Sequence, residues 1–350
     1  MRKSVYCGNI KIGGGAPISI QSMTNVDSRD ERGLLAQIDR LTAAGCEIVR
    51  IAVPDMEAAE VFGRVKKQVS VPLVADIHFD YRLAIAAIEQ GADKIRINPG
   101  NIGSTERVRA VVTAAKERNV PIRIGVNSGS LEKDILEKNG GVTAEGLCES
   151  VLRNAALIED MGYDNLVLSL KSSDVRMNYE AHKLVFEKTE HPIHIGITEA
   201  GTLKRGKVKS AVGIGALLLA GIGDTMRVSL TADPVEEVVY AREILESIGI
   251  RTPQIDLISC PTCGRTRVDL QSLAAQVEER LSEIAVSRPL KVAVMGCVVN
   301  GPGEAREADF GACGGDGKGV IFAKGQVIKT VNECDIVDAL IDMIKKKASV

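Results

Sequence analysis

The chain has 350 residues, with 44 Lys and Arg against 46 Asp and Glu and a formal net charge of −2. This length allows one large domain and one smaller domain, and the composition excludes collagenous, disordered and coiled-coil proteins. The charge is nearly balanced, and the chain has no Trp, five Phe and five Tyr. We therefore expect neither nucleic-acid binding nor attraction to a membrane surface.

Two further features indicate where the protein works. No apolar stretch follows the first nine residues, and nowhere do eighteen apolar residues run together. We therefore expect a cytoplasmic protein. The chain has eight cysteines, too few for a disulfide scaffold at this length. In a reducing compartment a clustered subset of them indicates metal or redox chemistry instead.

Short runs rich in Ile, Val and Leu alternate with helical patterns along the first 250 or so residues, the length typical of a (β/α)8 barrel. The strand-like runs are Pro17–Gln21, Glu47–Ala52, Leu73–Ile77, Lys94–Asn98, Ile122–Val126, Asn165–Leu170, Ile193–Ile197 and Thr225–Leu230. Helical periodicity lies between most of them, as in Asp30–Ala44, Asp55–Gln68, Tyr81–Gln90, Thr105–Arg118 and Gly146–Met161. We predict a TIM-type barrel over residues 1–255, with a doubly wound parallel sheet as the alternative.

The pattern changes after residue 255, and we predict a separate small α+β domain over residues 256–350. Thr-Pro interrupts the helical pattern within Ile250–Gln254, where the joint between the domains is expected. The elements expected beyond it are a helix over Arg267–Ser287, a strand over Lys291–Met295, a Gly-rich stretch over Gly311–Gly319, strands over Val320–Lys324 and Gln326–Thr330, and a helix over Glu333–Lys347.

Charged side chains alternate with apolar ones inside the predicted strands. Arg96, for example, stands between Ile95 and Ile97. In a βα barrel one face of each strand meets the outer helices and the other fills the interior. The apolar set must then face the helices, and the charged set must point inward. This parity places five cations in the barrel interior, namely Arg50, Arg96, Arg123, Lys171 and Arg227.

Like charges buried together without a counter-ion are strongly unfavourable. One interpretation is an anionic ligand, a phosphate or a diphosphate, because arginine binds phosphate oxygens in bidentate fashion. The alternative is an internal salt-bridge network in which Asp76 and Glu199 neutralise the cations. We favour the anion because the cations outnumber these two carboxylates.

Active sites of this fold lie at the C-terminal ends of the strands. Other polar residues also fall at these ends, and a basic run after the seventh strand contains Lys209, which could reach the barrel mouth. The polar residues expected at the mouth are Asp76, His78, Asn98, Asn127, Lys171, Glu199 and Ser229.

Three cysteines stand in motif-like positions. Cys260 and Cys263 form a C-x2-C pair, and Cys297 follows an apolar strand on a loop flanked by Gly. A structural zinc site would need a fourth ligand, which Cys313 could supply. An iron–sulfur cluster held by three cysteines and a replaceable fourth ligand fits as well or better, and Glu304 is the oxygen ligand nearest in sequence.

Motifs along nearly the whole chain resemble the bacterial 4-hydroxy-3-methylbut-2-enyl diphosphate synthase family. The last two, which contain the three cysteines, are highly specific. The segments that carry the resemblance are Gln21–Asn25, Ala75–His78, Arg96–Ile102, Arg123–Leu131, Thr198–Gly201, Gly221–Thr225, Cys260–Arg265 and Met295–Asp309.

The resemblance implies an activity in isoprenoid biosynthesis. This family opens the ring of 2-C-methyl-D-erythritol 2,4-cyclodiphosphate by two-electron reduction with loss of water. A [4Fe–4S] cluster does the chemistry, flavodoxin or ferredoxin supplies the electrons, and the enzymes are head-to-tail homodimers. The competing hypotheses are a barrel transferase acting on a diphosphate ester, similar to dihydropteroate synthase and carrying a structural zinc, and a non-catalytic zinc-containing binding module.

The resemblance also assigns roles to individual residues. The cluster ligands fall on Cys260, Cys263, Cys297 and Glu304, whereas Cys313 and Cys334 match no cluster position. We expect substrate binding by Arg50, Arg96, Arg123, Lys171, Lys209, Arg227 and Ser229, and catalytic roles for Glu199, Asp76, Asn127 and His78.

Overall fold

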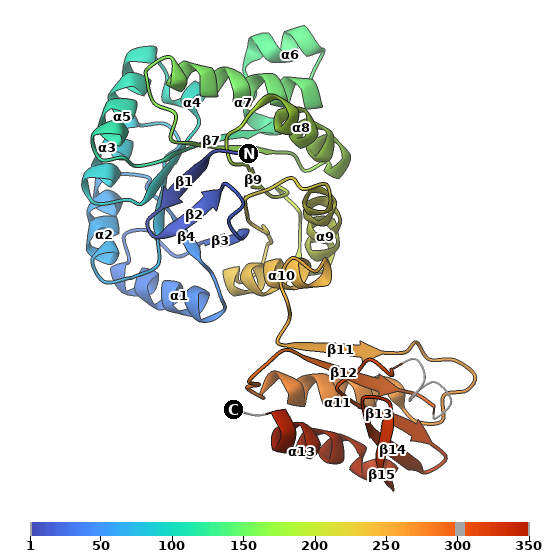
Figure 1. The fold of residues 1–350 in the computed structure, drawn as a ribbon. Coiled ribbons are helices and arrows are strands. Elements are labelled where there is room, and N and C mark those ends of the chain that lie inside the picture. The colour runs from blue at the N-terminus through green and yellow to red at the C-terminus, as the bar shows by residue number, and fades with distance from the viewer. Residues whose placement is uncertain (1, 298–304, 349–350) are drawn as a thin grey trace. The chain divides into compact units, whose positions relative to one another are not determined.

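The computed structural model describes residues 2–297 and 305–348. The chain divides into two compact units, Met1–Ile248 and Gly249–Val350 (Figure 1). The first unit holds a ring of parallel strands surrounded by helices, and the second holds a separate five-stranded sheet. Within the described residues, each helix is too short or too polar to cross a membrane.

The predicted TIM-type barrel is confirmed. Each strand pairs in parallel with its neighbours, β10 pairs with β3, and a bridge between Leu168 and Ile193 joins β8 to the start of β9. The ring is therefore closed. Its strands are β3 (Ser19–Met23), β4 (Ile48–Ala52), β5 (Leu73–Asp76), β6 (Lys94–Ile97), β7 (Ile122–Asn127), β8 (Leu166–Lys171), β9 (His194–Ile195) and β10 (Thr225–Met226).

The last two barrel strands are shorter than expected. Regular pairing covers only two residues in β9 and two in β10, although Arg227 N still donates to Ile195 O beyond them, at 3.1 Å. Ile197 and Val228 remain fully buried there. The apolar pattern therefore predicts burial correctly at this end of the barrel and overestimates strand length.

Helices surround the ring (Figure 1), and aspartates define where several of them begin. The side chains of Asp30, Asp55, Asp80, Asp174 and Asp233 accept hydrogen bonds from the first turns of α1, α2, α3, α8 and α10. The helices are α1 (Glu31–Ala43), α2 (Met56–Lys66), α3 (Tyr81–Glu89), α4 (Pro99–Ile102), α5 (Thr105–Glu117), α6 (Lys133–Asn139), α7 (Ala144–Glu159), α8 (Val175–Lys188), α9 (Leu203–Leu219) and α10 (Pro234–Ser247).

A hairpin that the sequence analysis did not predict covers the N-terminal end of the barrel. Its strands, β1 (Ser4–Cys7) and β2 (Ile10–Gly13), are antiparallel, and Val5 pairs with Ile12. The buried side chains of the hairpin pack on Ile48, Val74 and Val167 in one apolar cluster. These three residues come from the interior face of β4, β5 and β8, so the hairpin closes this end of the barrel with apolar contacts.

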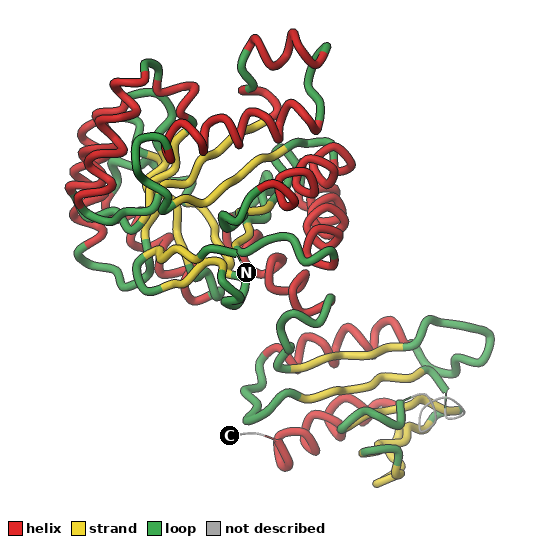
Figure 2. The backbone as a smooth tube through the Cα atoms, turned by 45° about the horizontal axis from the view of Figure 1, so that its top comes forward, coloured by secondary structure: helices red, strands yellow, loops and turns green. Residues whose placement is uncertain are grey.

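The second unit contains one mixed sheet and two helices (Figure 2). Both helices share one apolar core with the same face of the sheet. Strands β11 (Ile255–Ser259), β12 (Leu290–Met295) and β13 (Phe310–Gly315) run parallel, and β14 (Lys318–Ala323) and β15 (Gln326–Asn332) extend the sheet antiparallel. The helices are α11 (Leu270–Ser282) and α13 (Ile336–Ala348), and the short 3-10 turn Glu333–Asp335 precedes α13.

The structure adds two strands to the elements expected in this unit and corrects the bounds of one helix. The Gly-rich stretch is largely the central strand β13, because Gly311 and Gly314 leave room for Phe322 and Val268, which a Cβ atom would displace. Strand β11 was not predicted. Helix α11 begins later than expected, at Leu270, where the Asp269 side chain caps it by accepting from Ser272 N, and it ends at Ser282 rather than Ser287.

Candidate active site

The five cations predicted to point inward all line one cavity inside the barrel. The cavity has a volume of about 110 Å³. Its lining residues come from the strands, with Arg123 near the start of β7, and from the loops that follow the C-terminal ends of the strands. They are Arg50, Asp76, His78, Arg96, Arg123, Gly125, Asn127, Ser169, Lys171, Thr198, Arg227 and Ser229.

Asp76 is the shared counter-charge in this cavity. Its carboxylate lies 3.4 Å from Arg96 Nη1, 3.9 Å from Arg50 Nε and 3.2 Å from His78 Nε2. Burial by itself would raise the pKa of Asp76, but Arg50, His78 and Arg96 hold it well below its ordinary value. The Asp76 carboxylate therefore stays ionised at neutral pH.

Burial and mutual repulsion act on the cations. Burial lowers the pKa of Arg50 to about 10. Burial, with the charges of Arg50 and Arg96, also lowers the pKa of Arg123 well below its ordinary value, and Lys171 is affected in the same way by burial, Arg50 and Arg123. A negative charge in the cavity would stabilise the charged form of each of these groups.

Glu237 on α10 is a second buried carboxylate, which the sequence analysis missed. It pairs with Arg227, with Nε–Oε2 and Nη2–Oε1 both at 3.1 Å. Its place in an ordinary amphipathic helix gave no signal of a site, because the first turn of α10 contains two adjacent glutamates, Glu236 and Glu237, and the sequence does not distinguish them. In the described part of the chain, five cations thus face two carboxylates around this cavity, and the surplus is positive.

Two glycines make room for the cations. A Cβ atom on Gly125 would collide with the guanidinium of Arg96, which donates to Gly125 O at 3.2 Å. A Cβ atom on Gly196 would lie 2.6 Å from Arg227 O and 3.1 Å from Lys171 Nζ. The missing side chains therefore let Arg96 and Lys171 cross the barrel interior.

Three residues expected at the barrel mouth do not line this cavity. Asn98 is buried and caps α4, where its Oδ1 accepts from Gly100 N at 3.1 Å. Glu199 is exposed in the loop after β9, and its backbone has φ of +50°, in the left-handed region that non-glycine residues rarely adopt. Such strain clusters at functional sites. Lys209 is half-buried on α9. The roles expected for Glu199 and Lys209 in the site therefore remain predictions.

Lys94 and His194 lie in the barrel interior and are fully buried. Lys171 Nζ lies 3.5 Å from His194 Nε2, and burial with the nearby charges of Arg123 and Lys171 holds the pKa of His194 well below its ordinary value. Lys94 Nζ has no hydrogen-bond partner among the described residues. Burial lowers its pKa to about 8.

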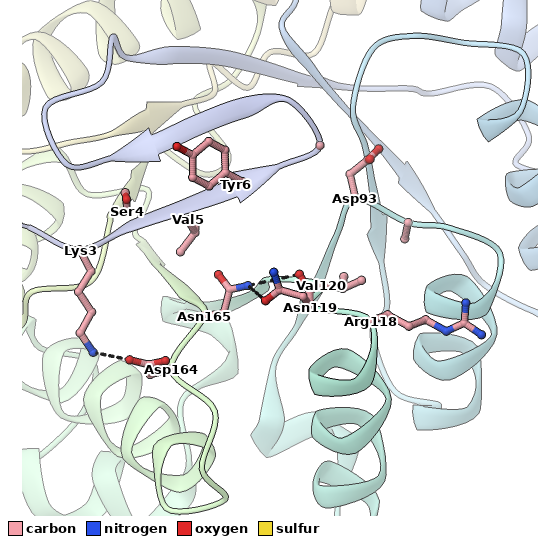
Figure 3. A pocket seen from close by; sticks show the side chains of 12 residues that line it. Lys3, Ser4, Val5, Tyr6, Asp93, Arg118, Asn119, Val120, Asp164 and Asn165 are labelled. Carbon is pink, nitrogen blue, oxygen red and sulfur yellow. Dashed lines mark hydrogen bonds and ion pairs between the residues drawn. The ribbon is translucent and has the colours of Figure 1, made fainter.

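A larger hollow of about 750 Å³ lies beside the hairpin, near the N-terminal ends of β6 and β8 (Figure 3). Lys3 Nζ bonds Asp164 at 3.0 Å there, and Asn165 Nδ2 donates to Asn119 Oδ1 at 3.2 Å. None of the five inward cations lines this hollow. Because barrel active sites lie at the C-terminal ends of the strands, size does not identify the site here.

The three motif cysteines lie near one end of the second sheet. Cys260 directly follows β11. One residue, Gly296, separates Cys297 from the end of the neighbouring parallel strand β12. Gly296 N donates to Cys260 Sγ at 3.3 Å. Cys263 lies in the next turn, where its N–H donates to Thr266 Oγ1 at 3.1 Å, and hydrogen bonds, chiefly from the Arg265 backbone, lower its pKa.

This donor set fits an iron–sulfur group in its chemistry, because thiolates are the usual ligands and N–H···S bonds tune such groups. Among residues 2–297 and 305–348, no three Cys, His, Asp or Glu side chains gather closely enough to hold a metal ion. Glu304 lies outside the described residues. Cys313 is buried on β13, and Cys334 is exposed.

Comparison with known families identifies both units. Residues 2–242 match the GcpE TIM-barrel domain, and residues 256–346 match the GcpE protein C-terminal domain. The chain belongs to the GcpE family. Among curated relatives, 4-hydroxy-3-methylbut-2-en-1-yl diphosphate synthase (flavodoxin) of Caldanaerobacter subterraneus subsp. tengcongensis is 56% identical, over 99% of this chain and 97% of the relative. The enzyme of the same name from Geobacter sulfurreducens is 54% identical, over 98% and 97%.

Solved structures support the barrel fold and nothing more. The dihydropteroate synthase of Stenotrophomonas maltophilia superposes with a TM-score of 0.52 at 14% identity, covering 71% of this chain and 99% of that one. The Yersinia pestis enzyme gives 0.51 at 15%, covering 71% and 98%. At this identity the likeness shows a shared fold, and it does not favour a dihydropteroate-synthase-like transferase.

We expect Gly125→Ala to weaken anion binding, because the added methyl group displaces the Arg96 guanidinium. The loss of a charge-assisted hydrogen bond raises the dissociation constant for pyrophosphate about tenfold, measured by calorimetry. Gly215→Ala on α9 is the control, because no atom lies near the added Cβ and α9 is helical there. Unchanged pyrophosphate affinity in Gly125→Ala would contradict the role given to this glycine.

We expect Lys94→Met to stabilise the fold, and more so at pH 7 than at pH 10. Burial, with Arg123 and Arg50, lowers the pKa of Lys94 to about 8 against the opposing charges of Cys7 and Asp93. The folded state thus disfavours the ammonium below pH 8, and this penalty disappears as pH rises toward the unfolded pKa. The shift corresponds to about 3 kcal/mol at pH 7. Urea unfolding at both pH values measures the difference.

The exposed Lys67 provides the control for this experiment, because Lys67→Met should change stability by less than about 0.5 kcal/mol at either pH. A loss of stability in Lys94→Met at pH 7 would mean that the ammonium has a favourable partner in the folded protein. An equal gain at both pH values would mean that packing, and not charge, causes the effect.

Proposed function

We propose that this chain reduces 2-C-methyl-D-erythritol 2,4-cyclodiphosphate to 4-hydroxy-3-methylbut-2-enyl diphosphate, with ring opening and loss of water. The observation that carries the proposal is the surplus of buried positive charge at the C-terminal ends of the barrel strands. The relatives, which match over nearly the whole chain, are flavodoxin-dependent diphosphate synthases, and this activity narrows the anion to a diphosphate and the reaction to a reduction.

The barrel residues bind the two phosphates and hold the carbon skeleton at the mouth. Arg50, Arg96 and Arg123 supply charge-assisted hydrogen bonds to phosphate oxygens, and Lys171 adds a point charge. Arg227 and Ser229 also line the cavity. Asn127, Asp76 and His78 complete the rim, and Glu199 handles the proton that the loss of water requires. Lys209 reaches the second phosphate.

We further propose that Cys260, Cys263, Cys297 and Glu304 hold a [4Fe–4S] cluster. The support is the C-x2-C turn beside Cys297 at one end of the sheet, together with the N–H···S bond to Cys260. When bound, the cluster supplies electrons one at a time. The name of the relatives includes flavodoxin, so flavodoxin is the electron donor that we propose, with ferredoxin as the alternative.

The assembly and the compartment are part of the same proposal. Because cations and cysteines belong to different units, the reaction requires a cysteine unit to close over a barrel. We propose a homodimer in which each subunit's cysteine unit serves the barrel of the other, as the family resemblance implies. We propose that this enzyme works in the cytoplasm, where eight free cysteines stay reduced.

Metal analysis tests the cofactor. Protein purified without oxygen should be brown and contain about four iron and four sulfide per chain. Replacing Cys260, Cys263 or Cys297 by Ala should remove the cluster, because each change deletes a thiolate ligand. Cys334→Ala, at an exposed cysteine, is the control and should keep it. Zinc without sulfide in the wild-type protein would contradict the proposal.

Thermal melting of Arg123→Met tests the anion site. Arg123 Nη1 donates to Gln21 Oε1 at 3.2 Å, and nearby cations oppose its charge. Removing it should therefore not destabilise the free protein, while the stabilisation by cyclodiphosphate falls. Losing charge-assisted bonds of about 1.5–3 kcal/mol corresponds to a roughly ten- to hundredfold rise in the dissociation constant.

The control is Arg153→Met on the surface of α7, which should leave the stabilisation by cyclodiphosphate unchanged. The salt-bridge network is the competing explanation. It predicts a large loss of stability in the free Arg123→Met protein together with unchanged stabilisation by the ligand. That pair of results would defeat the anion site.

A further inference from the structure

We propose that Glu237 is a positioning residue, which fixes the direction in which Arg227 faces the diphosphate in the barrel cavity. The inference rests on the proposed function and goes beyond it, because Glu237 does not line the cavity and acts only through Arg227 and the segment that follows it.

The Glu237 carboxylate accepts hydrogen bonds from four donors. Oε2 accepts from Ser22 Oγ at 2.9 Å and from Arg227 Nε at 3.1 Å, and Oε1 accepts from Arg227 Nη2 at 3.1 Å and from Leu230 N at 3.0 Å. The residue is only 3% exposed. A bidentate pair that is shielded from solvent fixes the plane of the guanidinium.

The pair occupies two of the five N–H groups of Arg227 and leaves Nη1 without a bond to Glu237. Nε and Nη2 are held by Glu237, and the contact described for Nη1 is a long one of 3.7 Å to Met23 Sδ. The Arg227 side chain is 15% exposed and lines the cavity. Arg227 therefore offers a directed donor, Nη1, rather than a mobile charge.

The same carboxylate also fixes a second part of the wall. Leu230, whose N–H it binds, directly follows Ser229, which lines the cavity. Ser22 belongs to β3, beside α10 (Figure 1). One side chain thus joins β3, the end of the last barrel strand and α10, and a displacement of the carboxylate would move Arg227 and Ser229 together.

The neighbouring residue Glu236 provides a matched control. It occupies the same turn of α10, but its side chain is 44% exposed and pairs with Lys207 on α9 at 3.4 Å. Glu236→Gln removes the same charge from the same turn without touching the cavity wall. A general effect of charge on the helix would therefore appear in both variants, and a positioning effect would appear only in Glu237→Gln.

Glu237→Gln keeps the size of the side chain but offers one acceptor oxygen to four donors, so Arg227 loses at least one of its two bonds. In the holoenzyme, with cyclodiphosphate and reduced flavodoxin, we expect kcat to fall about ten- to a hundredfold. KM should change less than about threefold, because the cavity keeps all its cations. In an Arg227→Met background the same substitution should lower kcat by a clearly smaller factor, since no guanidinium remains to be oriented and only the contacts to Ser22 Oγ and Leu230 N are still affected.

Nuclear magnetic resonance gives a readout that does not depend on activity. The Arg227 Nε–H signal, assigned by its absence in Arg227→Met, should exchange slowly with water in the wild-type protein. It should be lost or exchange rapidly in Glu237→Gln and persist in Glu236→Gln. A wild-type chain without turnover would refute the proposed function, whereas this signal would still decide whether Glu237 orients Arg227.

Three results would overturn the proposal. They are an unchanged kcat in Glu237→Gln, a fall of the same size in the Arg227→Met background, and an Nε–H signal that survives the substitution. If Glu237→Gln does not fold, Arg227→Lys serves instead, because it keeps the charge and cannot form the bidentate pair. We then expect retained pyrophosphate affinity with reduced kcat, and an unchanged kcat would overturn the proposal.

Discussion

Like charges confined in a small space determine how this barrel is built. Five cations line a cavity of about 110 Å³, and two unit charges 4 Å apart repel by roughly 4 kcal/mol at an effective dielectric constant of 20. The closed ring of strands and its apolar outer face supply the rigidity that holds them together. A bound polyanion would relieve this repulsion, so strain in the free protein becomes binding energy for the ligand.

The two buried carboxylates, Asp76 and Glu237, neutralise the cations around the cavity in different ways. Asp76 lies among Arg50, Arg96 and His78 and moderates the repulsion between the two arginines without being dedicated to one partner. Glu237 instead gives both oxygens to Arg227. A shared counter-charge leaves its cations free to turn toward a ligand, whereas a dedicated one fixes a donor in a single direction. The barrel uses both solutions in one cavity.

The fold of the barrel does not by itself identify the function of this protein. The barrel superposes on dihydropteroate synthases at about one-seventh sequence identity, which reflects a common frame for different chemistry. The surplus of inward cations and the cysteine unit distinguish this chain from a generic barrel. Membership of the GcpE family rests on both units, since each matches its own part of the family.

Local pattern in the sequence determined the barrel and the convergence of its cations. Side chains alternate strictly along a strand, so the parity of Arg96 between two isoleucines is enough to place it in the interior. Motif spacing likewise singles out Cys260, Cys263 and Cys297. Only the tertiary structure decided which charges meet. Glu237 lies ten residues from Arg227 on an ordinary helix, and nothing in its local sequence shows that it faces inward. The hairpin over the barrel end and the glycine-rich strand β13 were also missed, because packing against distant residues such as Val74 and Phe322 overrides their weak local signals.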